Sequence, residues 1–170
     1  MKSYKHLFDI CISEENRRKA IKQAKRTKRV RKMLKKRHMS DDELLCASYD
    51  WIMQYENAEH TPKIIYDGTA HKKRVIIVPT LEELIVQHCV AKAMEEMFWH
   101  GMYQHSYASL PKRGAHKAKK VIEKWIETDP KNVKYVLKMD VHHFFDSIPH
   151  DILKAKLRKH IHDDMMLDLL

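Results

Sequence analysis

A carboxylate follows an apolar stretch near the C-terminal end of this sequence. Residues 135–141 read Tyr-Val-Leu-Lys-Met-Asp-Val, and two histidines, two phenylalanines and Asp146 come next. The pattern predicts a buried strand that delivers Asp140 at its end. A carboxylate there is costly to desolvate unless a partner compensates it. Mg²⁺ is one such partner, because it prefers oxygen ligands. Taken alone, Asp140 is more simply explained as a helix cap or an ion-pair partner.

Other residues that could ligate a metal are three cysteines and two histidine pairs. Cys11, Cys46 and Cys89 are 35 and 43 residues apart, and the histidine pairs at 142–143 and 160–162 have no third ligand at a suitable spacing. We therefore predict neither a zinc site nor a disulfide framework. The cysteine usage favours a reducing, cytoplasmic compartment.

The basic residues are concentrated at one end of the 170-residue chain, whose net charge is +10. Residues 1–40 contain 15 Lys or Arg and three acidic residues, and no acidic residue lies between Arg17 and Arg37. The segment has no Gly or Pro, so we predict a basic helix that binds the phosphates of a nucleic acid. A solvated helix face or a fraying tail is the alternative. The predicted phosphate contacts are Arg17, Arg18, Lys25, Arg26, Lys28, Arg29, Arg31 and Lys32.

The elements that must position these residues follow from local signals. No run of 18 apolar residues is present, and residues 1–19 lack the apolar core of a secretory signal, so we predict no membrane partner. The fold class that these signals indicate is helix-rich α+β. The predicted elements are a helix of about 18 residues after Ser40, a hairpin of 63–66 and 72–78 around Asp67-Gly68-Thr69, a helix over 81–98 capped by Thr80 and Glu83, a helix over 116–126, the strand 135–141 and a helix over 152–170.

The last residues of the chain are apolar and lack a helix cap. We expect this turn to be exposed, to cause self-association and to mark a truncated chain. Its apolar residues are Met165, Met166, Leu167, Leu169 and Leu170.

Three blocks in the second half of the chain resemble, in the same order, motifs of bacterial reverse transcriptases. Residues 72–87 are similar to the fingers signature of a basic residue, a strand, a proline and a helix that carries Ile-Val-Gln. Residues 106–118 are similar to the Ser-Tyr-Gly-Phe-Arg block, with Tyr-Ala-Ser in place of Tyr-Gly-Phe. Residues 139–153 resemble the block that contains the first catalytic aspartate. Among the group II intron, diversity-generating retroelement and prophage enzymes of this family, the Tyr-Ala-Ser variant looks closer to the last two than to the group II intron enzymes.

The resemblance implies a role for the residues that follow the predicted strand. Asp140 matches the first metal-binding, catalytic aspartate, and the backbone carbonyl of Val141 would help to hold a second metal. The metals would be Mg²⁺ or Mn²⁺, held only once the full palm is present. Phe145 matches the residue that stacks under the sugar of the incoming dNTP, whereas we assign Phe144 to core packing.

The resemblance also implies contacts to the nucleotide and to the nucleic acid. Arg74 matches the fingers residue that holds the triphosphate of the dNTP, and Lys72 or Lys73 would assist it. The partners are therefore an RNA template, its primer and the dNTP. The predicted template contacts are Lys112, Arg113 and Gly114, for which a solvated loop is nearly as good an explanation.

The chain lacks one motif that this chemistry requires. A second aspartate pair, in a Tyr-x-Asp-Asp hairpin, is absent, and Asp163-Asp164 falls in a predicted helix whose surface it would occupy. We therefore expect a basic helical arm over 1–40, fingers over 41–130 and a truncated palm over 131–170, inactive alone.

Two other functions stay open. A non-catalytic basic RNA-binding module would explain the arm and would leave Asp140 a structural role. A small helical regulatory protein, bound to a partner through its last helix, would explain the apolar C-terminus but none of the three ordered blocks.

Overall fold

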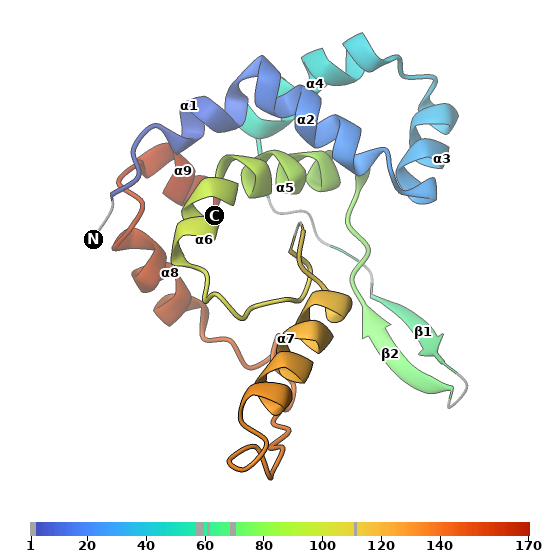
Figure 1. Ribbon diagram of the computed structural model, residues 1–170. Coiled ribbons are helices and arrows are strands. Elements are labelled where there is room, and N and C mark those ends of the chain that lie inside the picture. Colours follow the sequence, from blue (N-terminus) through green and yellow to red (C-terminus); the bar gives the residue numbers. More distant parts are fainter. Residues whose placement is uncertain (1–2, 57–59, 61, 69–70, 111) are drawn as a thin grey trace. The chain divides into compact units, whose positions relative to one another are not determined.

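The structure, a computed structural model, divides the chain into two compact units (Figure 1). The first unit comprises residues 1–96 and 154–170, and the second comprises residues 97–153. The described part is helix-rich and contains one two-stranded antiparallel sheet, so the predicted α+β class is confirmed. The residues described are 3–56, 60, 62–68, 71–110 and 112–170.

Helices make up most of the described elements. In chain order the elements are α1 (Leu7–Ile12), α2 (Glu14–Ala24), α3 (Lys28–Arg37), α4 (Asp41–Met53), β1 (Lys63–Asp67), β2 (Lys72–Ile76), α5 (Leu81–Ala93), α6 (Glu95–Gly101), α7 (Ala115–Thr128), α8 (His150–Arg158) and α9 (Asp164–Leu169).

Helix α5 forms the centre of the first unit, where it packs against α1, α2 and α4. Its apolar residues recur at helical spacing, and the side chains of Leu81, Ile85 and Cys89 have no exposed surface. Leu44 of α4 is equally buried. Burying a side chain of this size stabilises a fold by about 1.5–3 kcal/mol, so these helices hold one another in place.

A buried amide joins three of these helices. The Nδ2 of Asn16, near the start of α2, donates to the carbonyl of Cys11 at 3.2 Å and to the carbonyl of Cys89 at 3.0 Å. The buried amide of Asn16 therefore has two hydrogen-bond acceptors, one on α1 and one on α5.

The cysteines of the first unit differ in their environments. Cys11 and Cys89 are buried and Cys46 is exposed, and all three are free thiols. Burial, assisted by the nearby Cys89 and Asp163, raises the pKa of the Cys11 thiol to about 12. Burial also raises the pKa of the Cys89 thiol to about 12, against the opposing effect of Arg17. Both buried thiols therefore stay protonated near neutral pH.

The basic segment that we predicted as one helix is two helices. Helix α2 ends at Ala24, and Thr27 begins α3 by accepting a hydrogen bond from the backbone N–H of Val30. In a straight helix Val30 would point about 120° away from Ala24. The break allows both residues to be buried, together with Ile21 and Leu34.

The first unit confirms the two predicted capping boxes and the predicted hairpin. Ser40 with Glu43 begins α4, and Thr80 with Glu83 begins α5. The hairpin turns after Asp67, where Gly68 has a φ of 63°, and β2 ends at Ile76 rather than at residue 78. Thr69 of the predicted turn lies outside the described residues.

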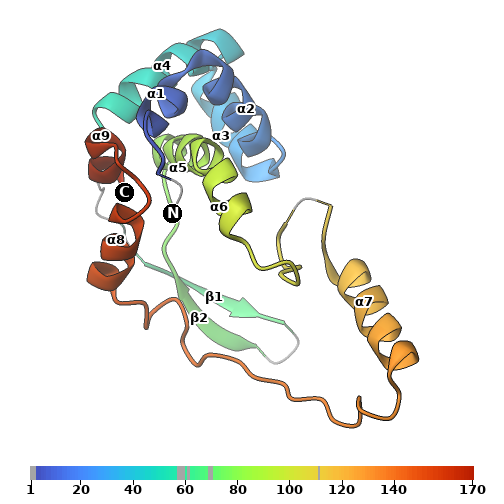
Figure 2. The same cartoon turned by 60° about the vertical axis from the view of Figure 1, so that its left-hand side comes forward.

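The two long helices predicted over 81–98 and 152–170 are also interrupted. Met94 ends α5 before α6 begins, and Asp163 caps α9 after the end of α8. Asp163 accepts hydrogen bonds from the backbone N–H of Met166 at 3.1 Å and of Phe8 at 2.8 Å. Its carboxylate therefore ties α9 to α1 and does not lie on a free helix surface as predicted (Figure 2).

The apolar C-terminus is partly buried, which corrects the prediction of a fully exposed turn. Met166 and Ile161 are buried within the first unit because α9 packs against α1. Of the five apolar residues of this turn, Met165 is the one that stays exposed, at 54%.

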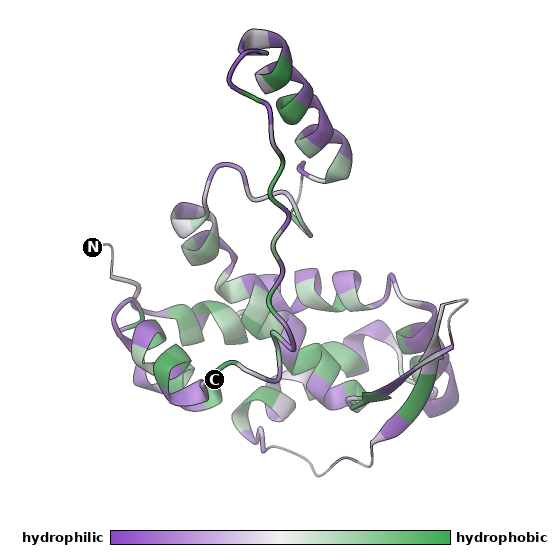
Figure 3. Cartoon of the chain, turned by 90° about the horizontal axis from the view of Figure 1, so that it is seen from below, coloured by the Kyte–Doolittle hydropathy of each residue, from purple (hydrophilic) through white to green (hydrophobic). Residues whose placement is uncertain are grey.

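The second unit has a different character. None of the described side chains of α7 is buried, and residues 150–153, the part of α8 that belongs to this unit, are exposed. The predicted strand over 135–141 is wrong, because these residues are irregular and Tyr135 and Val136 are 92% and 89% exposed. A strand needs a neighbour to pair its backbone, and no other strand of the described part pairs with this segment. Figure 3 shows the apolar residues along this segment and along α7.

The compact units do not coincide with the predicted boundaries at residues 40 and 130. Residues 1–40 belong to the first unit because α2 packs against α5. The division into arm, fingers and palm therefore stays a prediction about function. No helix within the described ranges has both the length and the apolar character needed to cross a membrane.

Candidate nucleic-acid interface

Helix α3 presents the most concentrated positive charge of the first unit. Val30 and Leu34 bury one side of this helix. Two contacts anchor it: Arg29 donates to the carbonyl of Pro79 at 2.5 Å, and Arg37 pairs with Glu82. The remaining basic residues are exposed, and their side chains form no ion pair or hydrogen bond with other described residues. They are Lys28, Arg31, Lys32, Lys35 and Lys36, which we call the α3 basic face.

The α3 basic face includes some, but not all, of the phosphate contacts that the sequence predicted, and it also contains residues that were not predicted. Lys35 and Lys36 were not among the predicted contacts, although both lie three to five residues after Arg31 and Lys32, at the spacing of one helix face. Arg26, just before α3, is also exposed.

Besides Arg29, three further predicted phosphate contacts are engaged within the protein. Arg17 donates through Nε to the carbonyl of Ile12 at 2.9 Å and through Nη1 to the carbonyl of Leu45, and it stacks over the ring of Tyr49 at 5.4 Å. This arginine therefore connects α1 and α2 to α4. The other two form ion pairs: Arg18 with Glu14 at 2.7 Å, and Lys25 with Asp41 at 2.5 Å.

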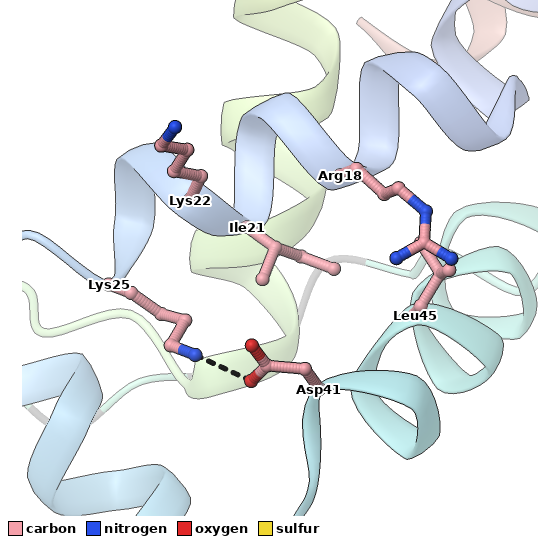
Figure 4. A pocket seen from close by; sticks show the side chains of 6 residues that line it. All are labelled: Arg18, Ile21, Lys22, Lys25, Asp41 and Leu45. Carbon is pink, nitrogen blue, oxygen red and sulfur yellow. Dashed lines mark hydrogen bonds and ion pairs between the residues drawn. The ribbon is translucent and has the colours of Figure 1, made fainter.

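A pocket of about 250 Å³ lies between α2 and α4 (Figure 4). Ile21 and Leu45 provide its apolar walls, and the ion pair of Lys25 and Asp41 lies at one side. Arg18 and Lys22 complete the lining, and Figure 4 shows the amine of Lys22 directed away from Asp41. The cations do not converge on one point, so the pocket adds positive charge next to α3 without forming an enclosed anion site.

The hairpin separates two of the residues predicted to bind the nucleotide. Ile65 pairs with Arg74, and Tyr66 pairs with Lys73. Because consecutive residues of a strand point to opposite faces, Arg74 and Lys73 lie on opposite sides of the hairpin. Lys72 pairs with Asp67 along the backbone, and its side chain lies outside the described part of the chain.

One buried carboxylate holds both ends of the hairpin. Glu83, which is 6% exposed, contacts the Nε2 of His60 through Oε1 at 2.7 Å and accepts from the backbone N–H of Thr80 through Oε2 at 2.7 Å. His60 precedes β1, and Thr80 follows β2. Burial would raise the pKa of Glu83, but the hydrogen bonds from Thr80 and His60 outweigh it and lower the pKa. We call this arrangement the Glu83 clamp.

The predicted catalytic residues lie on an exposed turn of the second unit. Asp140 is exposed and accepts a hydrogen bond from the backbone N–H of Val141 at 3.0 Å. Phe145 is 83% exposed, and its ring meets that of Phe144 edge-on, with centroids 5.3 Å apart. Phe144 is 51% exposed, so its assignment to core packing is wrong.

The residues around Asp140 do not make a metal site by themselves. Within the described ranges, no three His, Cys, Asp or Glu residues come together as metal ligands would. A two-metal reaction needs more than one carboxylate, so the described residues do not fit the predicted Mg²⁺ or Mn²⁺ pair.

The predicted template contacts form a structured loop before α7. The Nη1 of Arg113 donates to the carbonyls of Tyr103, Gln104 and Ser106 at 3.1, 3.1 and 2.8 Å. Arg113 therefore supports the loop, a role that its charge alone did not reveal. Lys112 is exposed, and Gly114 has a φ of 136°, a backbone conformation that favours glycine.

Comparison with known proteins shows a distant similarity. No family model matches the chain. Over 100 residues, 58% of this chain, it is 27% identical to a protein of Escherichia coli K12 named "Protein YkfC". This region covers 26% of that protein, so the chain spans about a quarter of the length of the relative it matches.

Proposed function

We propose that this chain is part of an RNA-directed DNA polymerase of the reverse-transcriptase kind, and that it binds the RNA template, its primer and the incoming dNTP. The observation that carries the proposal is the order of the three sequence blocks. The first falls on β2 and α5, the second on the loop that leads into α7, and the third on the turn after Asp140. Each block therefore lies on an element that reaches the surface.

The proposed roles near the nucleotide need accessible side chains. Arg74, Lys73 and Phe145 are all exposed. We assign Arg74 to the triphosphate, because a guanidinium can bind phosphate oxygens in pairs, and we assign Phe145 to the sugar. Asp140 and the carbonyl of Val141 would contribute to the metal site only together with further carboxylates.

The α3 basic face supports the proposed binding of RNA. Its five cations have no described ion-pair partner, so a polyanion would not have to break internal ion pairs to bind them. Phosphates that replace bound counterions account for much of the affinity of proteins for nucleic acids. The face is held on the first unit by Arg29 and Arg37.

A second candidate function is a basic RNA-binding module without chemistry. The observation that favours it is that Asp140 belongs to no group of three possible metal ligands in the described part of the chain. In that case the α3 basic face would still bind RNA, and Asp140 would have a structural role.

One substitution separates the two candidates. In a protein that carries this chain together with further palm residues, Asp140→Ala should abolish Mg²⁺-dependent dNTP incorporation on a primed RNA template and leave RNA affinity nearly unchanged. Asp164→Ala, which removes an exposed carboxylate of α9, is the matched control and should retain incorporation. Incorporation that survives Asp140→Ala would contradict the polymerase, and loss of RNA binding with it would make Asp140 structural.

A further inference from the structure

A cluster of aromatic rings surrounds His105 in the second unit. The ring of His105 meets the ring of Trp125 edge-on, with centroids 4.9 Å apart, and meets Tyr103 in the same way at 5.4 Å. The Nδ1 of His105 also lies 3.0 Å from the hydroxyl of Tyr107. Edge-on contacts of this kind fix rings relative to one another. Residues 103–107 are thereby joined to α7 through Trp125.

The outer rings of the cluster face solvent. Tyr103 is 66% exposed and Trp125 is 48% exposed. We count Trp99 with the cluster because the guanidinium of Arg113, which supports the same loop, lies over its ring at 5.3 Å; Trp99 is 36% exposed. Large aromatic side chains that are held in place and yet exposed mark interaction surfaces rather than cores.

The loop that carries Tyr103 is held before any ligand binds. Arg113 donates to three carbonyls of residues 103–106, as described above. A ligand that stacks on Tyr103 would therefore not have to order this loop, and a preorganised loop lowers the entropic cost of binding.

The charge around the rings is strongly one-sided. Residues 97–122 contain no acidic residue, and Glu123 is the first one after them. On α7, Lys117 and Lys124 are two turns apart and lie on one side of the helix, about 90° around its axis from Trp125. Exposed rings beside unneutralised cations suit a ligand that combines flat, apolar groups with negative charge.

We propose that the cluster of Trp99, Tyr103, His105 and Trp125 binds single-stranded nucleic acid, with unpaired bases stacked on its exposed rings and phosphates near the lysines of α7. Base stacking on aromatic side chains and charge contacts to the backbone are the two parts of such sites. The inference rests on the proposed function and adds that this surface takes the unpaired strand. A duplex hides its base faces and would not use the rings.

The test measures affinity for single strands and duplexes separately. We would titrate the 170-residue chain into fluorescein-labelled oligo(rU) and oligo(dT) of about 12 nucleotides, and into an RNA duplex of the same length, with fluorescence anisotropy. Tyr103→Ala and Trp125→Ala should each weaken single-strand binding by about fivefold or more, and duplex binding by less than about twofold. Tyr103→Phe keeps the ring and should retain affinity. A difference between oligo(rU) and oligo(dT) identifies the preferred strand.

Tyr135→Ala is the matched control, because Tyr135 is a 92% exposed tyrosine of the same unit that lies outside the cluster. It should leave both affinities unchanged. Equal effects of Tyr103→Ala and Tyr135→Ala, or equal losses for single strands and duplexes, would overturn the inference while leaving RNA binding by α3 intact. A chain that binds neither probe would contradict the proposed function as well.

Discussion

The two units of this chain treat apolar residues in opposite ways. Among the described residues, every buried apolar side chain except that of Met97 belongs to the first unit. In the second unit, Leu137 and Met139 are 79% and 80% exposed, although their types would suit a core. The comparison shows that hydrophobicity alone does not bury a residue. A second element must be present to pack on it, as α5 is for α2 and α4.

The two units also differ in what their polar side chains bind. The first unit places Asn16 and Glu83 in its interior and gives each of them hydrogen-bond partners from separate segments. In the second unit, Arg113 donates hydrogen bonds to carbonyls of the loop that precedes it. Polar contacts thus join distant segments in the first unit and organise local turns in the second.

The largest expected difference between the units is in the cost of truncating a leucine. Leu44→Ala should lower the free energy of unfolding by about 2–5 kcal/mol, because it leaves a cavity beside α5. Leu137→Ala, the same change in the second unit, should alter it by less than about 0.5 kcal/mol. Urea denaturation followed by circular dichroism measures both. Comparable losses from the two substitutions would mean that the second unit has a core of its own.

The next difference concerns which lysines and arginines bind RNA. The salt dependence of binding is measured as the slope of the logarithm of the binding constant against the logarithm of the salt concentration. Replacing the five residues of the α3 basic face by Gln should make this slope for duplex RNA smaller in magnitude by about 3 or more, because each lost phosphate contact contributes about 0.9. The control variant loses five positive charges elsewhere in the chain, by replacement of Lys131, Lys134, Lys138, Lys154 and Lys159 with Gln. If the slope of the control variant changed equally, binding would depend on net charge rather than on α3.

The smallest expected difference is a pH dependence that belongs to the first unit. The pKa of Glu83 lies below its ordinary value of 4.5 in the folded chain. The stability it contributes is therefore complete above that value and is lost as the pH falls through the lowered pKa. Glu83→Gln should reduce stability at neutral pH by about 1 kcal/mol and remove this part of the acid dependence.

The effect can be measured as the midpoint of urea denaturation of the unmodified chain and of Glu83→Gln at several pH values between about pH 3 and pH 7. Glu127→Gln, at the exposed end of α7, should leave the profile unchanged. A Glu83→Gln profile that runs parallel to the unmodified one would show that the Glu83 clamp does not stabilise the hairpin ends through its charge.

Local sequence signals predicted the parts of the fold that local contacts determine. The capping boxes at Ser40 and Thr80 and the turn at Gly68 each depend on neighbours within a few residues. The breaks after Ala24 and at Met94 contain no Gly or Pro, and packing against distant elements decides them. The segment at 135–141 was predicted as a strand because its composition suits one, but no described strand pairs with it.

The candidate site was predictable to a similar extent. Charge density identified the segment that carries α3, but it did not distinguish Arg17, whose guanidinium contacts backbone carbonyls, from exposed Arg31. For the same reason it did not reveal that Arg113 donates to backbone carbonyls of its own loop. A count of charges cannot include carbonyls that tertiary structure brings near. The roles of Asp140 and Phe145 depend on residues that would have to lie near this turn, and they stay predictions.

The positions of the three cysteine thiols allow the opening of the first unit to be followed by chemical labelling. Thiolates, not thiols, react with alkylating reagents, and the buried Cys11 and Cys89 have pKa values of about 12 whereas Cys46 is exposed. A maleimide should therefore modify Cys46 while the first unit is closed. It should modify Cys11 and Cys89 only when α1 and α5 separate. The rate at which the second and third labels appear then reports how readily these helices separate, without any engineered probe.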